Sequence, residues 1–309
     1  MDAINLVLKL DLQFFAAGDN NDLPVRRYEK QFKDMLQTVF NKRAYFGDFS
    51  AGGIEALDGV KESATAFSIK TTDIPMVLGT YATGANVAFG TGTANTSRFG
   101  PRKEIIYVNT DVPYAANWAF DEGLDRFTVN AELQAAVADR LVLQAQAQTK
   151  LMDDAVAAFL NTNAGKTEQL TAYDEAAVSA LFDKLSVYYT DLEVVGTKVA
   201  KVTPQLYNII IASKLTVKEK GSSVNIDTDY IYSYKDFVIQ KVPTSKIPSG
   251  SCALVYVPSI GKTFTGISTT RTIEVEGFDG IALQGAGKYG NFIPNDNKKA
   301  VTKVTVPTP

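Results

Sequence analysis

The sequence contains no histidine, and this absence removes much of the usual catalytic apparatus. Without an imidazole group, Ser-His-Asp triads, Cys-His nucleophiles and every histidine-containing metal site are excluded. Carboxylate pairs and lysines remain, so composition by itself does not exclude an enzyme. We nevertheless expect a protein that is not an enzyme, with no catalytic, cofactor-binding or metal-binding residues.

Cysteine is almost absent, since Cys252 is the only one. No intrachain disulfide can form, which fits folding in a reducing cytoplasm. The neighbouring residues are Ala-Leu-Val-Tyr-Val, so the sequence predicts a buried thiol on a strand.

A strong charge imbalance and a long apolar run are both missing. The chain has 31 basic and 34 acidic residues, a formal net charge of −3, so neutralising nucleic-acid phosphates is not its main task. No stretch reaches the roughly 20 apolar residues of a membrane span, and the first residues lack the basic region of a signal peptide. With 309 residues and 45% apolar content, the chain can bury a substantial core in one or two domains.

Glycine and proline are absent between Gly123 and Gly165, and this gap predicts a long helix from Thr128 to Leu160. At about 1.5 Å per residue, such a helix is roughly 50 Å long. One face carries an apolar stripe: Val129, Leu133, Val137, Leu141, Ala145, Met152, Val156 and Leu160. The opposite face is predicted to be solvated: Gln134, Asp139, Arg140, Gln146, Lys150, Asp153 and Asp154.

A coiled coil is the alternative for this helix. Counted from Val129, a heptad register places Arg140 at a seam position, which favours a single amphipathic helix against a sheet. Asp153 and Asp154 are adjacent and point to different parts of the helix surface, so we expect a solvated face rather than a metal site.

Two segments near the start are apolar but differ in pattern. Residues 1–17, which include Leu12, Phe14 and Phe15, end at a polar Gly-Asp-Asn-Asn-Asp hinge and predict an arm that docks outside its own fold. Residues 28–45 predict an amphipathic helix.

Residues 67–78 and 103–112 are rich in Ile, Val and Thr and predict the two strands of a long hairpin. Between them, residues 79–101 are mostly Gly, Ala, Thr and Asn, a composition that favours a projecting, functional tip. Within and beside this tip, we expect Phe89 and Phe99 to be anchors, and Arg98 and Arg102 to pair with acidic groups across an interface.

The rest of the chain predicts a mixed α+β order. The predicted helices are residues 171–189 and a short one that begins at Thr203-Pro204. The predicted strands are residues 193–202, 237–242, 253–257, 262–267, 272–276 and 300–306.

Two motifs suggest nucleotide sites without the required context. Gly285, Gly287 and Gly290 have the spacing of a dinucleotide fingerprint, but Asn-Phe-Ile-Pro-Asn-Asp-Asn follows and cannot begin the required helix, so we expect a turn. Gly261-Lys262-Thr263 resembles the end of a phosphate-binding loop, but it lacks the earlier glycine and precedes a predicted strand.

The order of these parts resembles the major capsid proteins of tailed bacteriophages with the Hong Kong 97-like fold, in particular those of phages that infect Gram-positive bacteria. Two segments carry the resemblance. Near the start is Leu10-Asp11-Leu12-Gln13-Phe14-Phe15-Ala16, and near the end are Gly280-Ile281-Ala282-Leu283-Gln284, Lys288-Tyr289-Gly290, Ile293-Pro294 and Asn297-Lys298-Lys299-Ala300-Val301.

The resemblance implies an α+β fold that is divided along the chain. It comprises an N-terminal arm (1–50), an extended β-hairpin loop (67–112), a peripheral domain with the long spine helix (113–166), an axial domain (167–271) and return strands (272–309).

The implied function is that of a major capsid (head) protein, which assembles with itself as pentamers and hexamers into an icosahedral or prolate shell. Such a shell encloses double-stranded DNA without sequence-specific binding, and it is built in the bacterial cytoplasm with a separate scaffolding protein and a portal. The expected intersubunit contacts are Leu12, Phe14, Phe15, Phe89, Arg98, Phe99 and Arg102.

The sequence departs from the branch of this family whose shells cross-link themselves through a lysine on the extended loop. Residues 79–102 contain no lysine, so we expect non-covalent contacts between subunits. Three alternatives stay open: an encapsulin-type nanocompartment shell protein, a small enzyme without histidine, and a surface-binding module.

Overall fold

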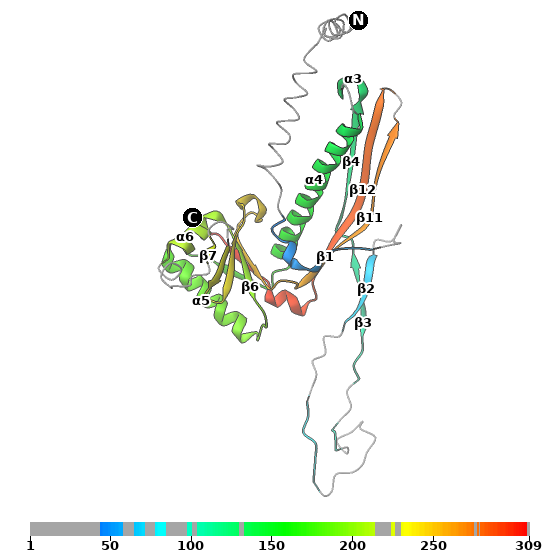
Figure 1. Cartoon of the computed structure of the whole chain (residues 1–309). Helices are drawn as coiled ribbons and strands as arrows, with labels where there is room; N and C mark the ends of the chain where they lie inside the picture. Colours follow the sequence, from blue (N-terminus) through cyan, green and yellow to red (C-terminus); the bar gives the residue numbers. More distant parts are fainter. Residues whose placement is uncertain are drawn as a thin grey trace, which may run out of the picture.

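The structure is a computed structural model that describes residues 44–57, 65–71, 78–84, 98–100, 104–129, 133–213, 224–225, 230–274, 277 and 279–307. It contains a four-stranded sheet with a long helix along it, a seven-stranded sheet with helices against it, and a hairpin that projects away from both (Figure 1). The predicted α+β class is therefore confirmed.

The four-stranded sheet has the order β1-β11-β12-β4. Its strands are β1 (Ser50–Ala56), β4 (Ala116–Asp125), β11 (Gly261–Glu274) and β12 (Gly280–Phe292). Helix α4 (Leu133–Thr162) follows the short helix α3 (Arg126–Val129) and contacts β12 and β4. This confirms the long helix from residue 133 onwards, and its packing against a sheet rather than as a coiled coil; residues 130–132 lie outside the described residues.

The predicted stripe of α4 is buried only in its C-terminal half. Met152, Val156 and Leu160 are buried, whereas Leu141 is exposed. The N-terminal half contacts β4 through polar groups. There, Arg140 donates to both carboxylate oxygens of Glu122, at 2.9 and 2.6 Å, and Gln144, which is itself buried, donates to the same carboxylate at 3.0 Å. The Arg140 side chain, which was predicted on the solvated face, is 42% exposed, but its hydrogen bonds to Glu122 direct it toward the sheet. These hydrogen bonds lower the pKa of the Glu122 carboxyl.

The glycines of residues 285–290 lie within strand β12 rather than in a turn, which corrects the sequence prediction. Gly287 lies opposite Trp118 of β4, and a Cβ at that glycine would come within 2.7 Å of the indole ring. Gly290 makes room for the Phe264 ring in the same way. The predicted strands 262–267 and 272–276 are also one strand, β11, because it pairs with β12 as far as Glu274.

We expect Gly287→Val to destabilise the protein by about 1–3 kcal/mol, since the added side chain must displace the Trp118 ring. Trp118 is the only tryptophan, so its fluorescence should shift together with the unfolding midpoint in urea. Ala286→Val, at the exposed neighbouring position, is the matched control. Equal effects of the two substitutions would contradict close packing of the glycine against the indole.

The seven-stranded sheet has the order β5-β13-β10-β6-β9-β8-β7. Its strands are β5 (Lys166–Gln169), β6 (Lys198–Val202), β7 (Val224–Asn225), β8 (Tyr230–Tyr234), β9 (Phe237–Lys241), β10 (Ser251–Tyr256) and β13 (Thr302–Thr305). The predicted strands in this region all overlap observed ones. Across both sheets, strands β1, β4, β5, β7, β8 and β12 were not predicted.

Helices α5 (Glu175–Asp191) and α6 (Pro204–Ala212) confirm the two helices predicted in this region. Helix α5 begins at Glu175, later than predicted, because the carboxylate of Asp174 caps its first turn and accepts from the Ala177 amide at 2.7 Å. Cys252 is buried as predicted, and burial raises the pKa of its thiol to about 11.

The hairpin consists of β2 (Thr65–Thr71) and β3 (Val108–Pro113), which pair antiparallel from Thr65↔Pro113 to Thr71↔Val108. This confirms the predicted hairpin, although residues 104–107, which were predicted as part of its second strand, are not in a strand. The predicted arm (1–17) and the helix predicted at residues 28–45 lie outside the described residues, except for Ala44 and Tyr45, which are not helical.

Candidate assembly interface

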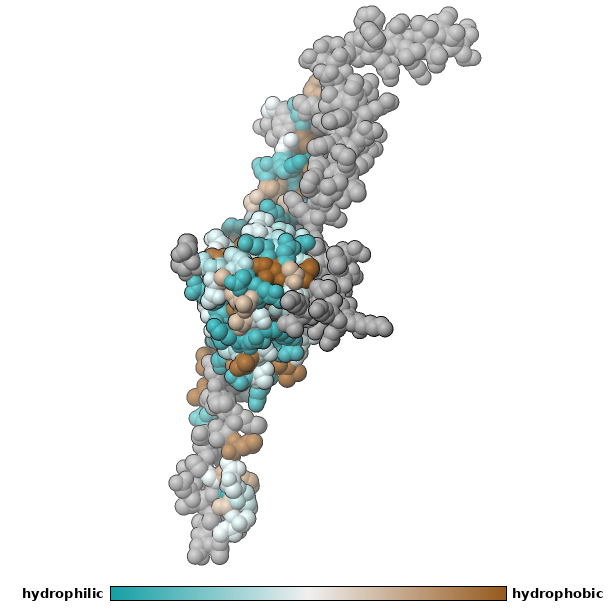
Figure 2. All heavy atoms as spheres, turned by 90° about the vertical axis from the view of Figure 1, so that its left-hand side faces the viewer, coloured by the Kyte–Doolittle hydropathy of each residue, from teal (hydrophilic) through white to brown (hydrophobic). Residues whose placement is uncertain are grey.

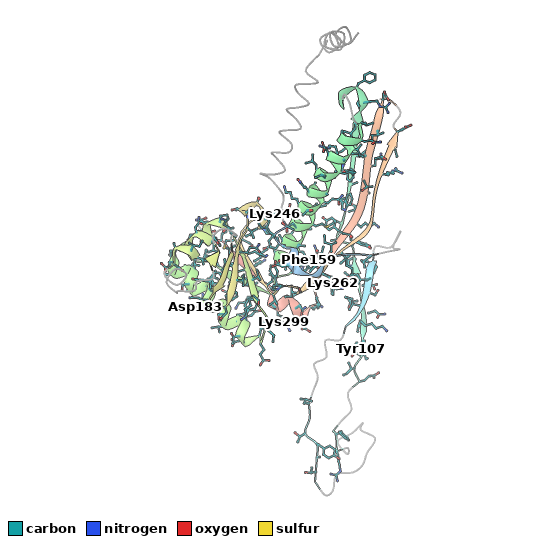
Figure 3. All side chains as sticks on the ribbon, viewed as in Figure 1. Tyr107, Phe159, Asp183, Lys246, Lys262 and Lys299 are labelled. Atoms are coloured by element: carbon teal, nitrogen blue, oxygen red, sulfur yellow. The ribbon has the colours of Figure 1, made fainter. Side chains whose placement is uncertain are left out.

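The projecting part of the hairpin exposes apolar side chains that its own fold does not cover. We call these residues the hairpin patch: Leu78, Tyr81, Phe99, Ile105, Ile106, Tyr107 and Val108. Figure 3 shows Tyr107 pointing away from the body, and Figure 2 shows apolar residues along the same projection. Because monomeric proteins rarely expose contiguous apolar patches, the hairpin patch indicates an interaction surface.

The two arms of the hairpin meet again beyond the paired strands. The Tyr81 and Phe99 rings pack edge to face with centroids 5.0 Å apart, and the Ala82 amide donates to the Arg98 carbonyl at 2.9 Å. The Arg98 guanidinium donates to the Ala82 carbonyl at 3.0 Å. Two of the predicted contact residues are therefore placed here: Phe99 is 81% exposed, and Arg98 bonds within its own hairpin.

The other predicted contact residues, Leu12, Phe14, Phe15, Phe89 and Arg102, lie outside the described residues. Their contacts stay predictions. Sequence reasoning missed Ile105, Ile106 and Tyr107 as interface candidates, although this run of three large apolar residues next to a predicted hairpin tip was a usable signal.

The base of the hairpin is held firmly against the four-stranded sheet. The Phe67 ring packs edge to face on Phe264 and Phe292, with centroids 5.1 and 5.9 Å apart, and Ala66 and Val112 are buried with them. A base fixed in this way can present the hairpin patch at a set angle to a neighbouring molecule.

An apolar groove of about 530 Å³ lies beside this base, and we call it the base groove. Its apolar walls include Leu57, Phe67, Ile69 and Phe292. Lys262 and Glu55, whose side chains form an ion pair at 2.8 Å, also line it. The sequence could not predict the base groove, because its residues come from separate segments that only the fold brings together.

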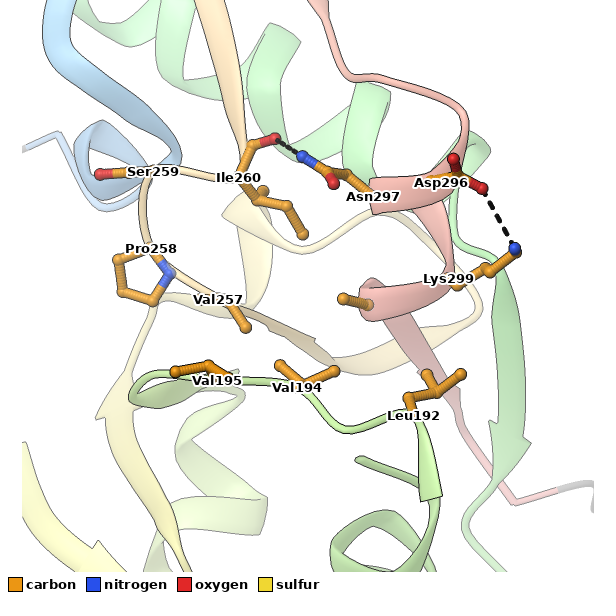
Figure 4. Close-up of a pocket in the computed structure, with 11 residues that line it drawn as sticks. Leu192, Val194, Val195, Val257, Pro258, Ser259, Ile260, Asp296, Asn297 and Lys299 are labelled. Atoms are coloured by element: carbon orange, nitrogen blue, oxygen red, sulfur yellow. Dashed lines mark hydrogen bonds and ion pairs between the residues drawn. The ribbon is translucent and has the colours of Figure 1, made fainter. Parts of the chain in front are cut away.

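A second groove, of about 350 Å³, lies where residues 192–195 face residues 257–260 and 296–300 (Figure 4). Val194, Val195 and Val257 contribute apolar surface. Its polar side chains are engaged with neighbours, since Lys299 pairs with Asp296 at 3.1 Å and Asn297 donates to the Ile260 carbonyl at 3.1 Å. The polar side chains named here therefore do not form an evident pair of nucleophile and base in this groove.

The described part of the chain contains no group of three or more Cys, Asp and Glu side chains that could hold a metal ion. None of the described helices is long and apolar enough to cross a membrane.

Two buried charges fix the chain where it enters the body at residues 45–49. Asp153 on α4 is 4% exposed; its Oδ1 accepts from the Tyr45 and Phe46 amides, both at 2.8 Å, and its Oδ2 lies 3.0 Å from Lys246 Nζ. Burial acts to lower the pKa of Lys246, but the hydrogen bonds that its ammonium group donates to Asp154 and Asp153 outweigh this effect and raise that pKa. The prediction that Asp153 lies on a solvated face was wrong, because the entering chain covers it.

The second buried charge is Lys201 on β6, which holds the same entering segment from the side of the seven-stranded sheet. Its Nζ lies 2.9 Å from Asp48 Oδ2, and the Tyr256 hydroxyl donates to Asp48 Oδ1 at 2.6 Å. Phe46 and Phe49 are buried beside them in one apolar cluster. Residues 45–49 are therefore held in place by packing and by two charged anchors.

The sequence matches no protein-family model and no curated protein at a significant level. The fold, in contrast, is similar to solved phage capsid structures. Against the mature capsid of bacteriophage PhiM1 the TM-score is 0.62 at 11% identity, covering 85% of this chain and 87% of that one. The capsid of cyanophage P-SCSP1u gives 0.61 at 10% identity, with 87% and 89% covered.

The capsid of Ralstonia phage GP4 gives a TM-score of 0.54 at 11% identity, with 87% of this chain and 92% of that chain covered. The similarity therefore extends over most of both chains. At identities this low, the comparisons establish the fold, and the chain has the Hong Kong 97-like fold of tailed-phage capsid proteins.

Proposed function

We propose that this protein is a structural, non-enzymatic shell subunit, the major capsid protein of a tailed bacteriophage. The observation that carries the proposal is the hairpin patch: a rigidly based projection with exposed apolar side chains, on a fold that matches capsid structures over most of its length. A monomer gains nothing from such a projection, whereas a neighbouring subunit can bury it.

The hairpin patch and the base groove are two different apolar surfaces on the same subunit. A head-to-tail contact between identical subunits needs two such different surfaces. A contact between different patches on identical subunits generates rings when the rotation closes, and rings of such subunits build shells. In the proposed shell, the hairpin patch of one subunit lies against the base groove of the next. Pentamers and hexamers would then form through the same contact.

Several finer features of the proposal rest on the sequence resemblance. We propose a closed icosahedral or prolate shell that is assembled in the bacterial cytoplasm with a scaffolding protein and a portal, and that packages double-stranded DNA without sequence-specific binding. We also propose that residues 1–50 act as an arm whose last residues, 45–49, are anchored in the body, with residues 113–166 and 167–271 as peripheral and axial domains. Because β11 begins at Gly261 and belongs to the sheet of β4, the proposed boundary is better drawn before that residue than at 271.

The proposal is tested by expressing the full chain alone and with its candidate scaffolding protein. Velocity sedimentation should separate a fast, uniform species from free subunits, and negative-stain microscopy should show it as closed shells. A chain that stays monomeric under both conditions contradicts the proposal. Shells purified from cells with a co-packaged enzyme rather than with double-stranded DNA would favour a nanocompartment instead.

Assembled shells should contain no covalent link between subunits, because residues 79–102 offer no lysine to attack a neighbour. After boiling in denaturant, the particles should run on a gel as a single band near 33.5 kDa. A ladder of dimers and higher oligomers that survives reducing agent would show that another residue supplies the nucleophile.

A further inference from the structure

Lys201 is an unusual lysine, because it is fully buried in the seven-stranded sheet and has both a carboxamide and a carboxylate beside it. The residue is 2% exposed, and its partner across the parallel strands β6 and β9 is Gln240, which is 3% exposed. Nζ of Lys201 donates a hydrogen bond to the side-chain carbonyl of Gln240 and lies 2.9 Å from Asp48 Oδ2. The amide carbon of Gln240 is one bond away from the oxygen that this amine contacts.

The surroundings of Lys201 and Gln240 exclude water and lower the local dielectric constant. The rings of Phe46 and Tyr256 both have their centroids 6.0 Å from Lys201 Nζ, and both residues are almost completely buried. In such surroundings the charged form of an amine is disfavoured unless it is paired, and a neutral amine is a nucleophile. Holding the amine next to the acyl group turns an otherwise slow bimolecular step into an intramolecular one.

We propose that Lys201 and Gln240 form an intrachain isopeptide bond once the sheet has folded, with Asp48 as the catalytic carboxylate. Asp48 accepts a proton from the Lys201 ammonium group, and the neutral amine attacks the Gln240 amide carbon. Asp48 then returns the proton to the departing nitrogen as the old carbon–nitrogen bond breaks. Of the three ammonium protons, one stays on the new amide and two leave with the released nitrogen, so the products are the isopeptide and one ammonium ion.

This reaction needs no oxidant, metal or cofactor, and the groups around Asp48 fit its role. The side chain of Asp48 is 31% exposed, whereas Lys201 is enclosed, so the carboxylate lies between the reacting amine and solvent. The Tyr256 hydroxyl, at 2.6 Å from Asp48 Oδ1, fixes the carboxylate with its other oxygen toward the amine. Tyr256 is in this sense a positioning residue.

The bond would join β6 to β9 and close the chain between residues 201 and 240 into a ring. It is independent of the proposed function and of the missing lysine on the hairpin tip, because both reacting residues belong to one subunit. Denatured shells would still run as monomers.

The test is the intact mass of the purified full-length chain under denaturing conditions. We expect a mass lower than that of the sequence by one ammonia, and a tryptic digest that is not cut after Lys201 but contains a branched peptide joining that residue to Gln240. Asparagine can lose the same mass by forming a succinimide ring, but mild base hydrolyses such a ring. The mass deficit of an isopeptide bond should survive this treatment. A wild-type chain at full mass, or a deficit located elsewhere, overturns the proposal.

Variants separate the roles of the three residues. Lys201→Met removes the nucleophile and should restore the full mass for its sequence, as should Asp48→Asn, which keeps the shape but cannot accept the proton. Lys246→Met is the matched control, because Lys246 is also largely buried and carboxylate-paired but bonds to Asp153 and Asp154. It should keep the deficit. A deficit that persists in Asp48→Asn would remove Asp48 from the mechanism.

Discussion

Phe99→Ala combined with Ile106→Asp should abolish shell formation and leave the subunit folded. The two side chains are 81% and 61% exposed in the free subunit, so they contribute little to its stability. Burying each against a neighbour contributes about 1.5–3 kcal/mol, and the contact recurs in every subunit. The loss of about 3–6 kcal/mol per contact corresponds to a fall of roughly a hundredfold or more in its association constant.

Sedimentation velocity measures the loss of shell formation, and circular dichroism measures whether the subunit stays folded. The double variant should sediment as free subunits with an unchanged spectrum and unfolding midpoint. Val187→Asp is the matched control, because Val187 on α5 is also 61% exposed but lies far from the hairpin, and it should assemble normally. Unfolding of the isolated double variant would show instead that the hairpin patch belongs to the core of its own chain.

Asp153→Ala should be the most destabilising single substitution among those proposed, with a loss of about 3–5 kcal/mol. It leaves the Tyr45 and Phe46 amides without their acceptor and leaves Lys246 without its buried partner. Urea unfolding of the isolated subunit measures the effect. Asp154→Ala, which removes the more exposed carboxylate paired with the same lysine, should cost no more than about 1 kcal/mol.

A double-mutant cycle with Lys246→Met isolates the buried pair. Asp153→Ala together with Lys246→Met should cost less than the sum of the two single changes, by about 1–3 kcal/mol, since the second change removes the lysine charge that has lost its buried partner. Additive effects, or equal losses for Asp153→Ala and Asp154→Ala, would mean that Asp153 does not anchor the entering chain.

The parts of the fold that the sequence could predict depend on local patterns. The absence of glycine and proline between Gly123 and Gly165 was sufficient to predict helix α4, and composition alone indicated a projecting hairpin. The apolar stripe of α4 was correct in register but not in extent, because the N-terminal half of the helix rests on β4 through Glu122 and Arg140. Periodicity shows which residues share a face, and not how far along that face the packing continues.

The errors concern residues whose surroundings come from distant segments. Asp153 was expected to be solvated because it was assigned to the polar face of its helix. It is instead covered by residues 45 and 46, which are more than 100 positions away in the sequence. The glycines near Gly287 were expected in a turn, although they lie in strand β12, where Trp118 occupies the space of a side chain at Gly287 and Phe264 that of one at Gly290. The base groove and the Lys201–Gln240 contact likewise exist only after folding.

A cryo-electron microscopy map of the assembled particle tests the central claim most directly. The account predicts a closed shell in which the hairpin of each subunit leaves its own body and lies on the next subunit, with Ile106, Tyr107 and Phe99 buried against the residues of the base groove. A shell in which the hairpin folds back on its own chain, or in which the hairpin patch faces solvent, would contradict it.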